Sequence, residues 1–530
     1  MTLTRLNLRA LIRLLRAFPG LVESAASPRR LLWLSAAAML SACAAGPDFT
    51  RPAVPEGVSS LRSVPMSTTQ VEVPGGDSQV AEVGTEVAGR WWELYRSEAL
   101  SSMVVEAIRR NPDVAAARQA LVRADELARA AGAARAPVLG AEVSQERDRY
   151  AQAQDGGHGA PDYYSISEAK LGAVYDLDLW GRLRRSAEAA NAGADYARFE
   201  LEAVYLSLTT RVVEAAFTLS ALDSEISVQK QAVALDARWL DLVSGQLALG
   251  SENELDVALQ RSALAQAKLS LEGLLAEREK VHNELAALTG RSPSTMAAVA
   301  LDLSSFVLPH RLLVSIPAQL IEQRPDVRAA EALLHAETAR VGVATAARLP
   351  DITLSANTGS AALSGDRLFG SGNGFWSVAG GVSQTIFDAG SLRHQQRAQE
   401  AAMREAAERW RSVVVDSLRG VADALVAVDH DGVSLRYAAD DEQAADQGRR
   451  LLEEQYNIGS ASILKVLAVE RSWQAAELGL IQARENRFVD TVHLYGALGG
   501  GWWERNDVSV DETDSTTTRR TESIMPNEPQ

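Results

Sequence analysis

The sequence is poor in cysteine, aromatic residues and long apolar runs, and it lacks an excess of basic residues. Cys43 is the only cysteine among 530 residues, and aromatic residues make up 5% of the chain. No apolar run reaches the roughly twenty residues that a permanent transmembrane helix requires. The net charge of −16 argues against nucleic acid as a partner, because phosphate binding needs a basic surface.

Motifs for catalysis and metal binding are also missing. The seven histidines are scattered without a metal-binding spacing such as His-x-x-x-His. No glycine-rich loop leads into a lysine-bearing helix, and no Gly-x-Ser-x-Gly motif occurs. We therefore predict that the protein is not an enzyme, with no catalytic residue, no metal site and no cofactor.

Long helix-forming runs and an internal repeat are the main positive signals. Alanine, leucine, glutamate, arginine and glutamine dominate long stretches of the chain, a composition typical of long helices. Ala131-Gly-Ala-Ala-Arg-Ala-Pro137 returns as Ala344-Thr-Ala-Ala-Arg-Leu-Pro350, and Leu249-Gly250-Ser251 returns as Ile458-Gly459-Ser460. Near-constant spacing over most of a chain indicates duplication of a whole structural unit.

Each half is predicted to contain a helix, two short strands, a very long helix, a tight turn and another long helix. The run from Arg182 to Leu247 contains no proline, and about 65 helical residues would span about 100 Å. The expected organisation is a first repeat at 91–289 with a hairpin at 138–178, a connecting segment at 290–316, and a second repeat at 317–500 with a hairpin at 350–388.

The predicted strands alternate between apolar and polar residues. In the first strand Leu139, Ala141 and Val143 face one way, and Gly140 and Glu142 the other. Four such strands cannot close a membrane barrel, and an open edge in lipid leaves backbone groups unpaired. The chain must therefore share its barrel, so that two, three or four copies would supply eight, twelve or sixteen strands.

The surroundings of Cys43 predict a lipid anchor. Arg29-Arg30 precedes an apolar run of about twelve residues, and Leu40-Ser41-Ala42-Cys43 matches a bacterial lipobox. We expect a leader and signal peptide over 1–42, a lipidated polar tether over 43–90, and a polar disordered tail over 501–530. Inner-membrane lipoproteins typically carry aspartate after the cysteine. This chain has Ala44 at that position, so its resemblance to bacterial lipoproteins implies the outer membrane.

The whole layout resembles the TolC-like outer-membrane factors, in particular the NodT-type efflux lipoproteins. The resemblance rests on the lipobox, on the two Gly-Ser turns and on an ordered set of short motifs. These motifs are Gly46-Pro47-Asp48-Phe49, Trp91-Trp92, Asn111-Pro112-Asp113-Val114, Leu179-Trp180-Gly181-Arg182, Arg324-Pro325-Asp326-Val327 and Phe387-Asp388-Ala389-Gly390.

This resemblance implies a mixed α and β fold and a place in a larger machine. Each of three copies would give four strands to a twelve-stranded outer-membrane β-barrel, continuous with a periplasmic α-helical barrel. The homotrimer would dock a periplasmic adaptor protein joined to an inner-membrane RND transporter, and act as the passive exit duct for drugs or other small molecules. A mixed group of short elements would come from 290–316 and from segments near both ends of the chain.

The same resemblance suggests which residues act at the periplasmic tip. The turns at Gly250, Ser251, Gly459 and Ser460 would contact the adaptor. Helices near Leu464 and Ala468 would close the tube, although relatives commonly have aspartate where this chain has Ala468, and Lys465 could place a cationic ring there. Candidates for gating bonds between helix pairs are Tyr456, Arg471, Glu470 and Asp256. Surface ion pairing for these residues, and a solvated lysine at 465, are the alternatives.

Two further interpretations stay open at this stage. Aromatic residues at the strand ends are predicted to form an interfacial girdle or else to pack loops. They are Tyr150, Tyr163, Tyr164, Phe369, Phe375 and Trp376. The alternative functions are an exit duct of a type I protein secretion system and a structural periplasmic lipoprotein without a pore. The alternating strands argue against the second, because a spacer has no use for a lipid-facing side.

Overall fold

The computed structural model describes residues 44–53, 67–83, 87–149, 163–296, 301–314 and 323–504. The predicted leader, Cys43, Tyr150 and the tail from residue 505 lie outside the described residues. The chain divides into two compact units. Unit 1 comprises residues 44–50, Asp125–Gly193 and His335–Glu405, and unit 2 comprises Arg51–Ala124, Ala194–Leu334 and the described residues from Ala406 onward.

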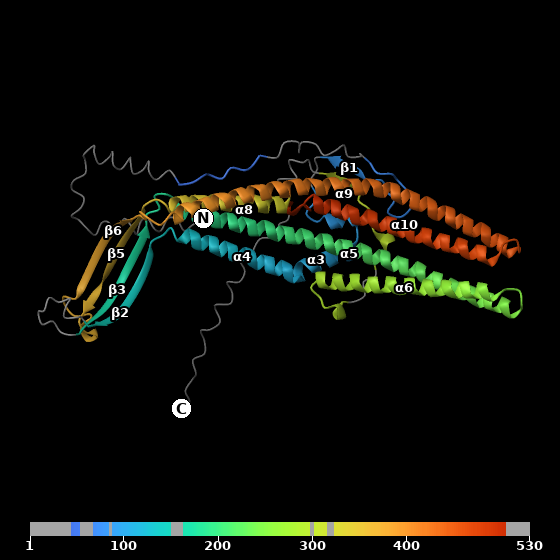
Figure 1. The fold of residues 1–530 in the computed structure, drawn as a ribbon, viewed down its shortest axis with the longest axis horizontal. Helices are drawn as coiled ribbons and strands as arrows, with labels where there is room; N and C mark the ends of the chain where they lie inside the picture. Colours follow the sequence, from blue (N-terminus) through green and yellow to red (C-terminus); the bar gives the residue numbers. More distant parts are fainter. Residues whose placement is uncertain are drawn as a thin grey trace, which may run out of the picture. The chain divides into compact units, whose positions relative to one another are not determined.

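Unit 1 contains a four-stranded antiparallel sheet (Figure 1). Its strands are β2 (Val138–Asp148), β3 (Tyr164–Asp176), β5 (Asp351–Ala362) and β6 (Gly374–Ser383), in the order β2-β3-β5-β6. Two hairpins from distant parts of the chain therefore meet through β3 and β5. The sheet leaves one edge of β2 and one edge of β6 without a partner among the described strands.

The helices of the two halves match in length. The long helices α5 (Arg182–Ala248) and α9 (Ser391–Asn457) have 67 residues each, and the return helices α6 (Glu254–Leu288) and α10 (Ile463–Ala497) have 35 each. Ahead of the hairpins, α4 (Pro112–Ala133) and α8 (Pro325–Ala346) have 22 residues each.

Helical periodicity in the sequence begins near Leu100 and runs to about Ala134, but the structure has two helices in this range. α3 (Glu98–Arg110) ends at Asn111, and α4 begins at Pro112. The Asn111 side chain accepts hydrogen bonds from the backbone N–H groups of Asp113 at 2.8 Å and Val114 at 3.2 Å. Asparagine favours this capping position and proline favours the first helical position, so the two residues start a new helix.

An aspartate shortly before each long helix caps the N-terminus of that helix. The Asp178 carboxylate accepts hydrogen bonds from the backbone N–H groups of Leu183 and Arg184, both at 2.9 Å. Asp388 accepts in the same way from Gly390 at 2.8 Å and Leu392 at 2.7 Å. A carboxylate at a helix N-terminus satisfies free donors and complements the helix dipole. Asp388 belongs to the motif Phe387-Asp388-Ala389-Gly390, and Asp178 directly precedes Leu179-Trp180-Gly181-Arg182, so both motifs stand at the start of a long helix.

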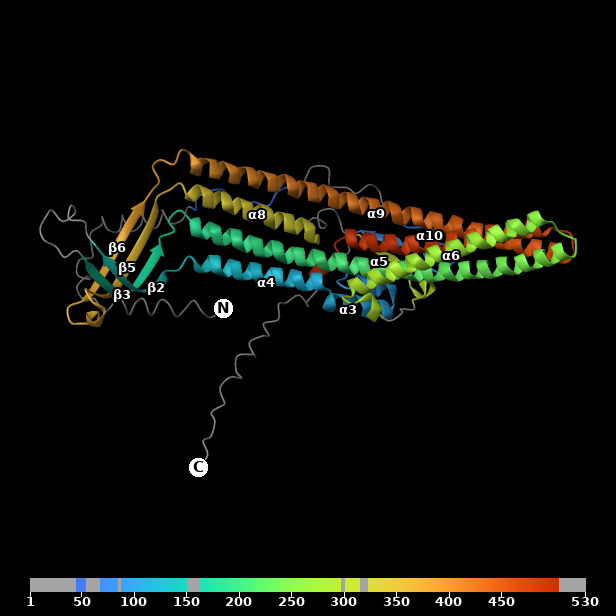
Figure 2. The same cartoon turned by 60° about the horizontal axis from the view of Figure 1, so that its bottom comes forward.

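Unit 2 holds the main hydrophobic core. α5 and α6, and likewise α9 and α10, form antiparallel helical hairpins (Figures 1 and 2). Their buried faces pack around aromatic side chains that include Trp91, Tyr95, Phe217 and Phe488. The rings of Tyr95 and Phe217 meet edge to face at 4.9 Å, an arrangement that aromatic pairs favour.

Short elements cover this core. β1 (Val80–Val83) pairs in parallel with β4 (Arg311–Val314). The short 3-10 helices of unit 2 are η1 (Trp91–Tyr95), η2 (Pro293–Thr295), η3 (Leu303–Ser305) and η5 (Trp502–Glu504). The 3-10 helix η4 (Gly365–Arg367) belongs to unit 1. Residues 67–83 differ from the extended tether expected over 43–90, because they contribute a strand and the buried side chains of Gln79 and Ala81.

No helix within the described ranges is both long and apolar enough to span a membrane.

Two acidic side chains face each other in the core of unit 2. Glu225 of α5 and Glu485 of α10 are each 9% exposed. Burial, followed by repulsion from Glu485, raises the pKa of Glu225 from its ordinary 4.5 to about 6. The folded protein therefore holds this proton to a higher pH than the unfolded chain does. This group's contribution to the free energy of unfolding falls as the pH rises through about 4.5 to 6.

Replacing Glu225 by glutamine should accordingly stabilise the protein only where the carboxylate is charged. We expect Glu225→Gln to raise the apparent Tm at pH 8 by a few degrees and to leave it nearly unchanged at pH 4.5. The exposed Glu272 of α6 offers a matched control, since Glu272→Gln should shift the Tm little at either pH. Equal stabilisation by Glu225→Gln at both pH values would contradict the assignment.

Candidate functional site

The sheet of unit 1 has one apolar and one polar face, and the strand register aligns them. Leu139 lies opposite Ala173, Ala173 opposite Ala356, and Ala356 opposite Val378. Because directly opposed residues project to the same side of a sheet, these four side chains form one apolar row across all four strands. The alternation read from the sequence is therefore continuous from strand to strand.

This apolar face is exposed within the single chain. Leu139 is 81% exposed, Trp376 78% and Val378 73%. Folding of one chain leaves these side chains in contact with solvent, and a contiguous apolar surface of this kind marks a membrane or protein contact.

The opposite face carries small and charged residues. The row next to the apolar one runs from Gly140 through Gly172 and Asn357 to Ser377. One step further along the strands, the Lys170 ammonium lies 3.3 Å from the Glu142 carboxylate and 3.5 Å from that of Glu168. This face is thus suited to water.

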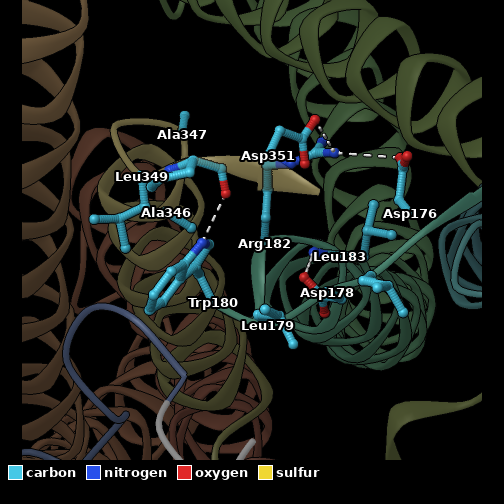
Figure 3. A pocket seen from close by; sticks show the side chains of 12 residues that line it. Asp176, Asp178, Leu179, Trp180, Arg182, Leu183, Ala346, Ala347, Leu349 and Asp351 are labelled. Carbon is cyan, nitrogen blue, oxygen red and sulfur yellow. Dashed lines mark hydrogen bonds and ion pairs between the residues drawn. The ribbon is translucent and has the colours of Figure 1, made fainter. Parts of the chain in front are cut away.

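A pocket of about 280 Å³ lies where the strands of unit 1 lead into helices (Figure 3). The Trp180 indole N–H donates a 2.8 Å hydrogen bond to the Pro350 carbonyl and so ties the two halves of the chain together. Arg182 lies between two carboxylates, 3.6 Å from Asp176 and 3.9 Å from Asp351. These spacings give a loose ion cluster at the base of the sheet.

The two turns predicted to contact a partner have the same backbone design. Gly250 and Gly459 adopt φ values of +75° and +74°. The Ser251 N–H donates to the Gln246 carbonyl at 3.0 Å, and the Ser460 N–H to that of Gln455 at 2.9 Å. This is the Schellman arrangement, in which a left-handed glycine ends the helix. Each serine hydroxyl bonds the same carbonyl at 3.0 Å.

The two helical hairpins of unit 2 contact each other near these turns. Val243 of α5, Val257 of α6 and Leu467 of α10 form a small buried cluster. Tyr456, a predicted gating residue, is half-buried against this cluster, and its ring meets that of Trp239 edge to face at 5.7 Å. Trp239 was not among the residues predicted from the sequence, and its position on the apolar side of α5 is the only local signal of this contact.

The other predicted tip residues occupy different environments. Asp256 is buried, and its hydrogen bond with Glu252 raises the pKa of the Glu252 carboxyl. Lys465, Ala468 and Arg471 are exposed at three-residue spacing along α10, a spacing that puts them on adjoining positions of one helix surface.

Leu464 lies in α10, but its side chain is outside the described residues. Glu470 is half-buried, and burial raises the pKa of its carboxyl while nearby Arg449 opposes the rise. The structure thus separates the predicted tip residues into an exposed row on α10 and a packed group around Tyr456 and Asp256.

The structure describes the side chains of some of the aromatic residues expected at the strand ends. Tyr163 is 53% exposed and Phe369 83% exposed, and the guanidinium groups of Arg147 and Arg149 each lie 5.5 Å from the Tyr163 ring. Phe375 is half-buried, and the Tyr164 side chain falls outside the described residues. The interfacial girdle remains a prediction.

Comparison with known proteins decides the family. A family model described as "Outer membrane efflux protein" matches residues 103–291 and 316–500. The chain belongs to this family.

Individual relatives and structures agree with this assignment. The chain is 30% identical over 424 residues to the pyoverdine export outer membrane protein OpmQ of Pseudomonas putida strain KT2440, covering 78% of this chain and 88% of the relative. It is 28% identical over 470 residues to the probable efflux pump outer membrane protein TtgC of the same strain, covering 88% and 94%. The solved structure of the outer-membrane channel OprN matches with 25% identity and a TM-score of 0.76, over 87% of this chain and all of that one.

Family membership confirms the resemblance inferred from the sequence motifs. The protein is an outer-membrane efflux protein with a mostly helical fold that also contains sheet, as in the related channels. The alternative of a structural lipoprotein without a transport role is therefore wrong. The family is one of transport proteins, in agreement with the sequence interpretation as a duct.

The glycine turns generate a direct test of their geometry. Gly250→Ala meets no neighbouring atom within 4 Å, so its cost should come only from the left-handed φ, at roughly 1 kcal/mol. We expect amide hydrogen exchange in residues 246–251 to accelerate about fivefold.

Gly245→Ala is the matched control, because Gly245 also has open space around it but lies within α5 with an ordinary helical backbone. Alanine there should slow local exchange, since it favours the helix over glycine. If the two substitutions had the same effect, the turn geometry would not be what limits position 250.

Proposed function

We propose that this protein is the outer-membrane exit duct of a tripartite efflux pump and that three copies of the chain complete one channel. In this proposal each copy contributes its four strands to a twelve-stranded barrel and its helices to a periplasmic tube. Drugs or other small molecules pass through passively, delivered by a periplasmic adaptor and an inner-membrane RND transporter.

The observation that carries the proposal is an exposed apolar face combined with two sheet edges that have no partner among the described strands. Backbone N–H and C=O groups cannot stay unpaired in hydrocarbon, since each costs several kcal/mol. β2 and β6 have such groups along one edge each. Pairing β6 of one copy with β2 of the next would satisfy both edges and bring the polar faces together around an aqueous lumen. The resemblance to TolC-like factors favours three copies over two or four.

An acyl anchor on Cys43 supports placement in the outer membrane. The lipobox at 40–43 and the following Ala44 are the sequence basis for this part of the proposal. The matched lengths of the paired helices support a duplicated gene as the origin of the two halves.

The tip residues supply the proposed contacts with the adaptor and the gate. The adaptor would contact the turns at Gly250-Ser251 and Gly459-Ser460. The exposed row Lys465, Ala468 and Arg471 would line the periplasmic aperture together with Leu464, and the packed Tyr456 and Asp256 would hold the helix pairs in the closed state. Relatives are named for different cargo, pyoverdine in one case and toluene in another, so the proposal specifies the exported compounds only as small molecules.

The two faces of β6 provide the experiment. Val378→Lys would place a charge on the lipid side at a cost of about 2–4 kcal/mol. We expect it to abolish the heat-resistant oligomer in detergent-extracted outer membranes and to abolish drug resistance. Ser377→Lys, one residue away on the polar face, should retain both. Equal tolerance of the two lysines would refute the assignment of the faces.

A second experiment tests the aperture. Three copies of Lys465 would form a cationic ring, which disfavours cation entry by like-charge repulsion. Lys465→Gln should therefore increase the cation preference of channels in planar bilayers, measured as a shift in reversal potential. Arg411→Gln, which removes an exposed cation paired with Glu408 on α9, is the control and should leave the potential unchanged. An unchanged reversal potential with Lys465→Gln would show that Lys465 does not line the aperture.

A further inference from the structure

The first described residues of the chain, 44–50, are bound closely to unit 1. The Ala45 N–H donates a 2.8 Å hydrogen bond to the Trp180 carbonyl, at the turn between β3 and α5. Gly181, with φ +78°, lies so close that a Cβ there would be 2.9 Å from the Ala44 Cβ. Ala44 therefore lies directly on the turn that joins a strand to a long helix.

Two glycines allow this segment, which we call the N-terminal arm, to reach α8. A Cβ at Gly46 would lie 2.9 Å from the backbone nitrogen of Gly342 and closer still to its Cα. A Cβ at Gly342 would lie 2.8 Å from the Ala45 carbonyl oxygen. Gly46 also has φ +89°, which side chains rarely adopt. Backbone touches backbone here, and neither position has room for a larger residue.

Asp48 and Phe49 then contact a connected set of polar side chains. The Asp48 carboxylate lies 2.5 Å from the guanidinium of Arg185, whose side chain is only 6% exposed. Arg185 also pairs with Glu188 at 2.8 Å, and Glu188 lies 3.0 Å from the His335 ring nitrogen.

The ring of Phe49 stacks on the ring of His335, with the ring centroids 4.3 Å apart and an interplanar angle of 19°. The arm therefore contacts this set of side chains a second time. Burial would raise the pKa of Glu188, but the hydrogen bonds from Arg185 and His335 outweigh it and hold the pKa below its ordinary value. Two consecutive arm residues thus bind one network from opposite ends.

The elements contacted come from both halves of the chain. Trp180, Arg185 and Glu188 belong to the first half, whereas His335 and Gly342 belong to α8 of the second half. The arm therefore bridges the halves beside the strand ends. Removing it would leave the buried Arg185 with one carboxylate fewer, which is costly for a desolvated charge.

We propose that the N-terminal arm is a clamp that transmits the restraint of the lipid anchor to both halves of unit 1. The inference rests on the proposed acylation of Cys43, which precedes the docked Ala44 by a single peptide bond, a Cα spacing of about 3.8 Å. An acyl chain attached to Cys43 would hold the strand–helix turn at the membrane surface. If residues 44–50 were instead a free tether, the same acyl chain would only tie the protein to the membrane. Lipid attachment thereby stabilises the assembled channel through the arm.

The first experiment tests docking alone. The photoreactive residue p-benzoyl-phenylalanine at position 49 should cross-link within the same chain to the α8 peptide containing His335, identified by mass spectrometry. Gly46→Val, which cannot make the close approach to Gly342, should abolish this product, and the exposed Ala53→Val should preserve it. Cross-linking to other peptides in the unaltered background would overturn the clamp. This readout requires neither trimer nor transport.

The second experiment tests coupling to the lipid. The temperature at which the oligomer dissociates in detergent is compared for Cys43→Ala, Phe49→Ala and the double variant. We expect each single change to lower it and the double variant to fall no further than the lower single one, because both remove the same restraint. Phe49→Tyr, which keeps the stacked ring, should behave as wild type. Additive losses, or no loss with Cys43→Ala, would overturn the proposal.

The two levels of the proposal can fail separately. The mass of the N-terminal peptide reports whether Cys43 is acylated, and absence of any oligomer in the wild type would refute the trimeric duct. In either case a retained position-49 cross-link would still establish the docked arm. If Gly46→Val failed to accumulate, Asp48→Ala, which removes the ion pair with Arg185, would serve as the undocked variant in the cross-linking experiment.

Discussion

The requirement that every backbone hydrogen bond be satisfied in an apolar surrounding governs this molecule. A four-stranded sheet in water can leave its edges to solvent, but a sheet with an exposed apolar face is built for surroundings without water. Among the described strands, β2 and β6 each carry part of the apolar row and one edge without a partner. The helices face no such constraint, because their backbone bonds close within each helix. In the proposed trimer, this difference makes the sheet depend on neighbouring copies more strictly than the helices do.

Patterns that repeat along the backbone could be predicted from the sequence because they are local. Alternation of apolar and polar residues predicted the four strands and their two faces. Long runs without proline predicted the two helices of 67 residues, and the Gly-Ser pairs predicted both turns. The break at Asn111 was missed, although Asn-Pro is itself a helix-start signal, because the apolar periodicity continues across it. Where periodicity and capping chemistry disagree, capping decides the boundary.

Contacts between distant segments could not be predicted in this way. The Gly-Pro-Asp-Phe motif indicated the family, but nothing local assigns Gly46 to Gly342 or Asp48 to Arg185. The same holds for Arg487, which is fully buried and donates hydrogen bonds to the Thr68 hydroxyl at 3.0 Å and to the Asp77 carbonyl at 2.5 Å. Composition marks residues 43–90 as polar and proline-containing, and such a segment is normally a linker. Here its described parts are held by buried arginines.

The two arginines indicate why a polar segment can be as firmly fixed as an apolar one. A buried guanidinium has five hydrogen-bond donors in a fixed planar arrangement and cannot lose its charge. Other parts of the chain must therefore supply acceptors at fixed positions around it. In unit 1 the partner is Asp48, and in unit 2 it is the backbone and side chains of residues 68–79. Each arginine thus specifies one position for a stretch of chain that has little apolar surface to bury. The described residues 44–53 and 67–83 are thus each held in part by a buried arginine, Arg185 in unit 1 and Arg487 in unit 2.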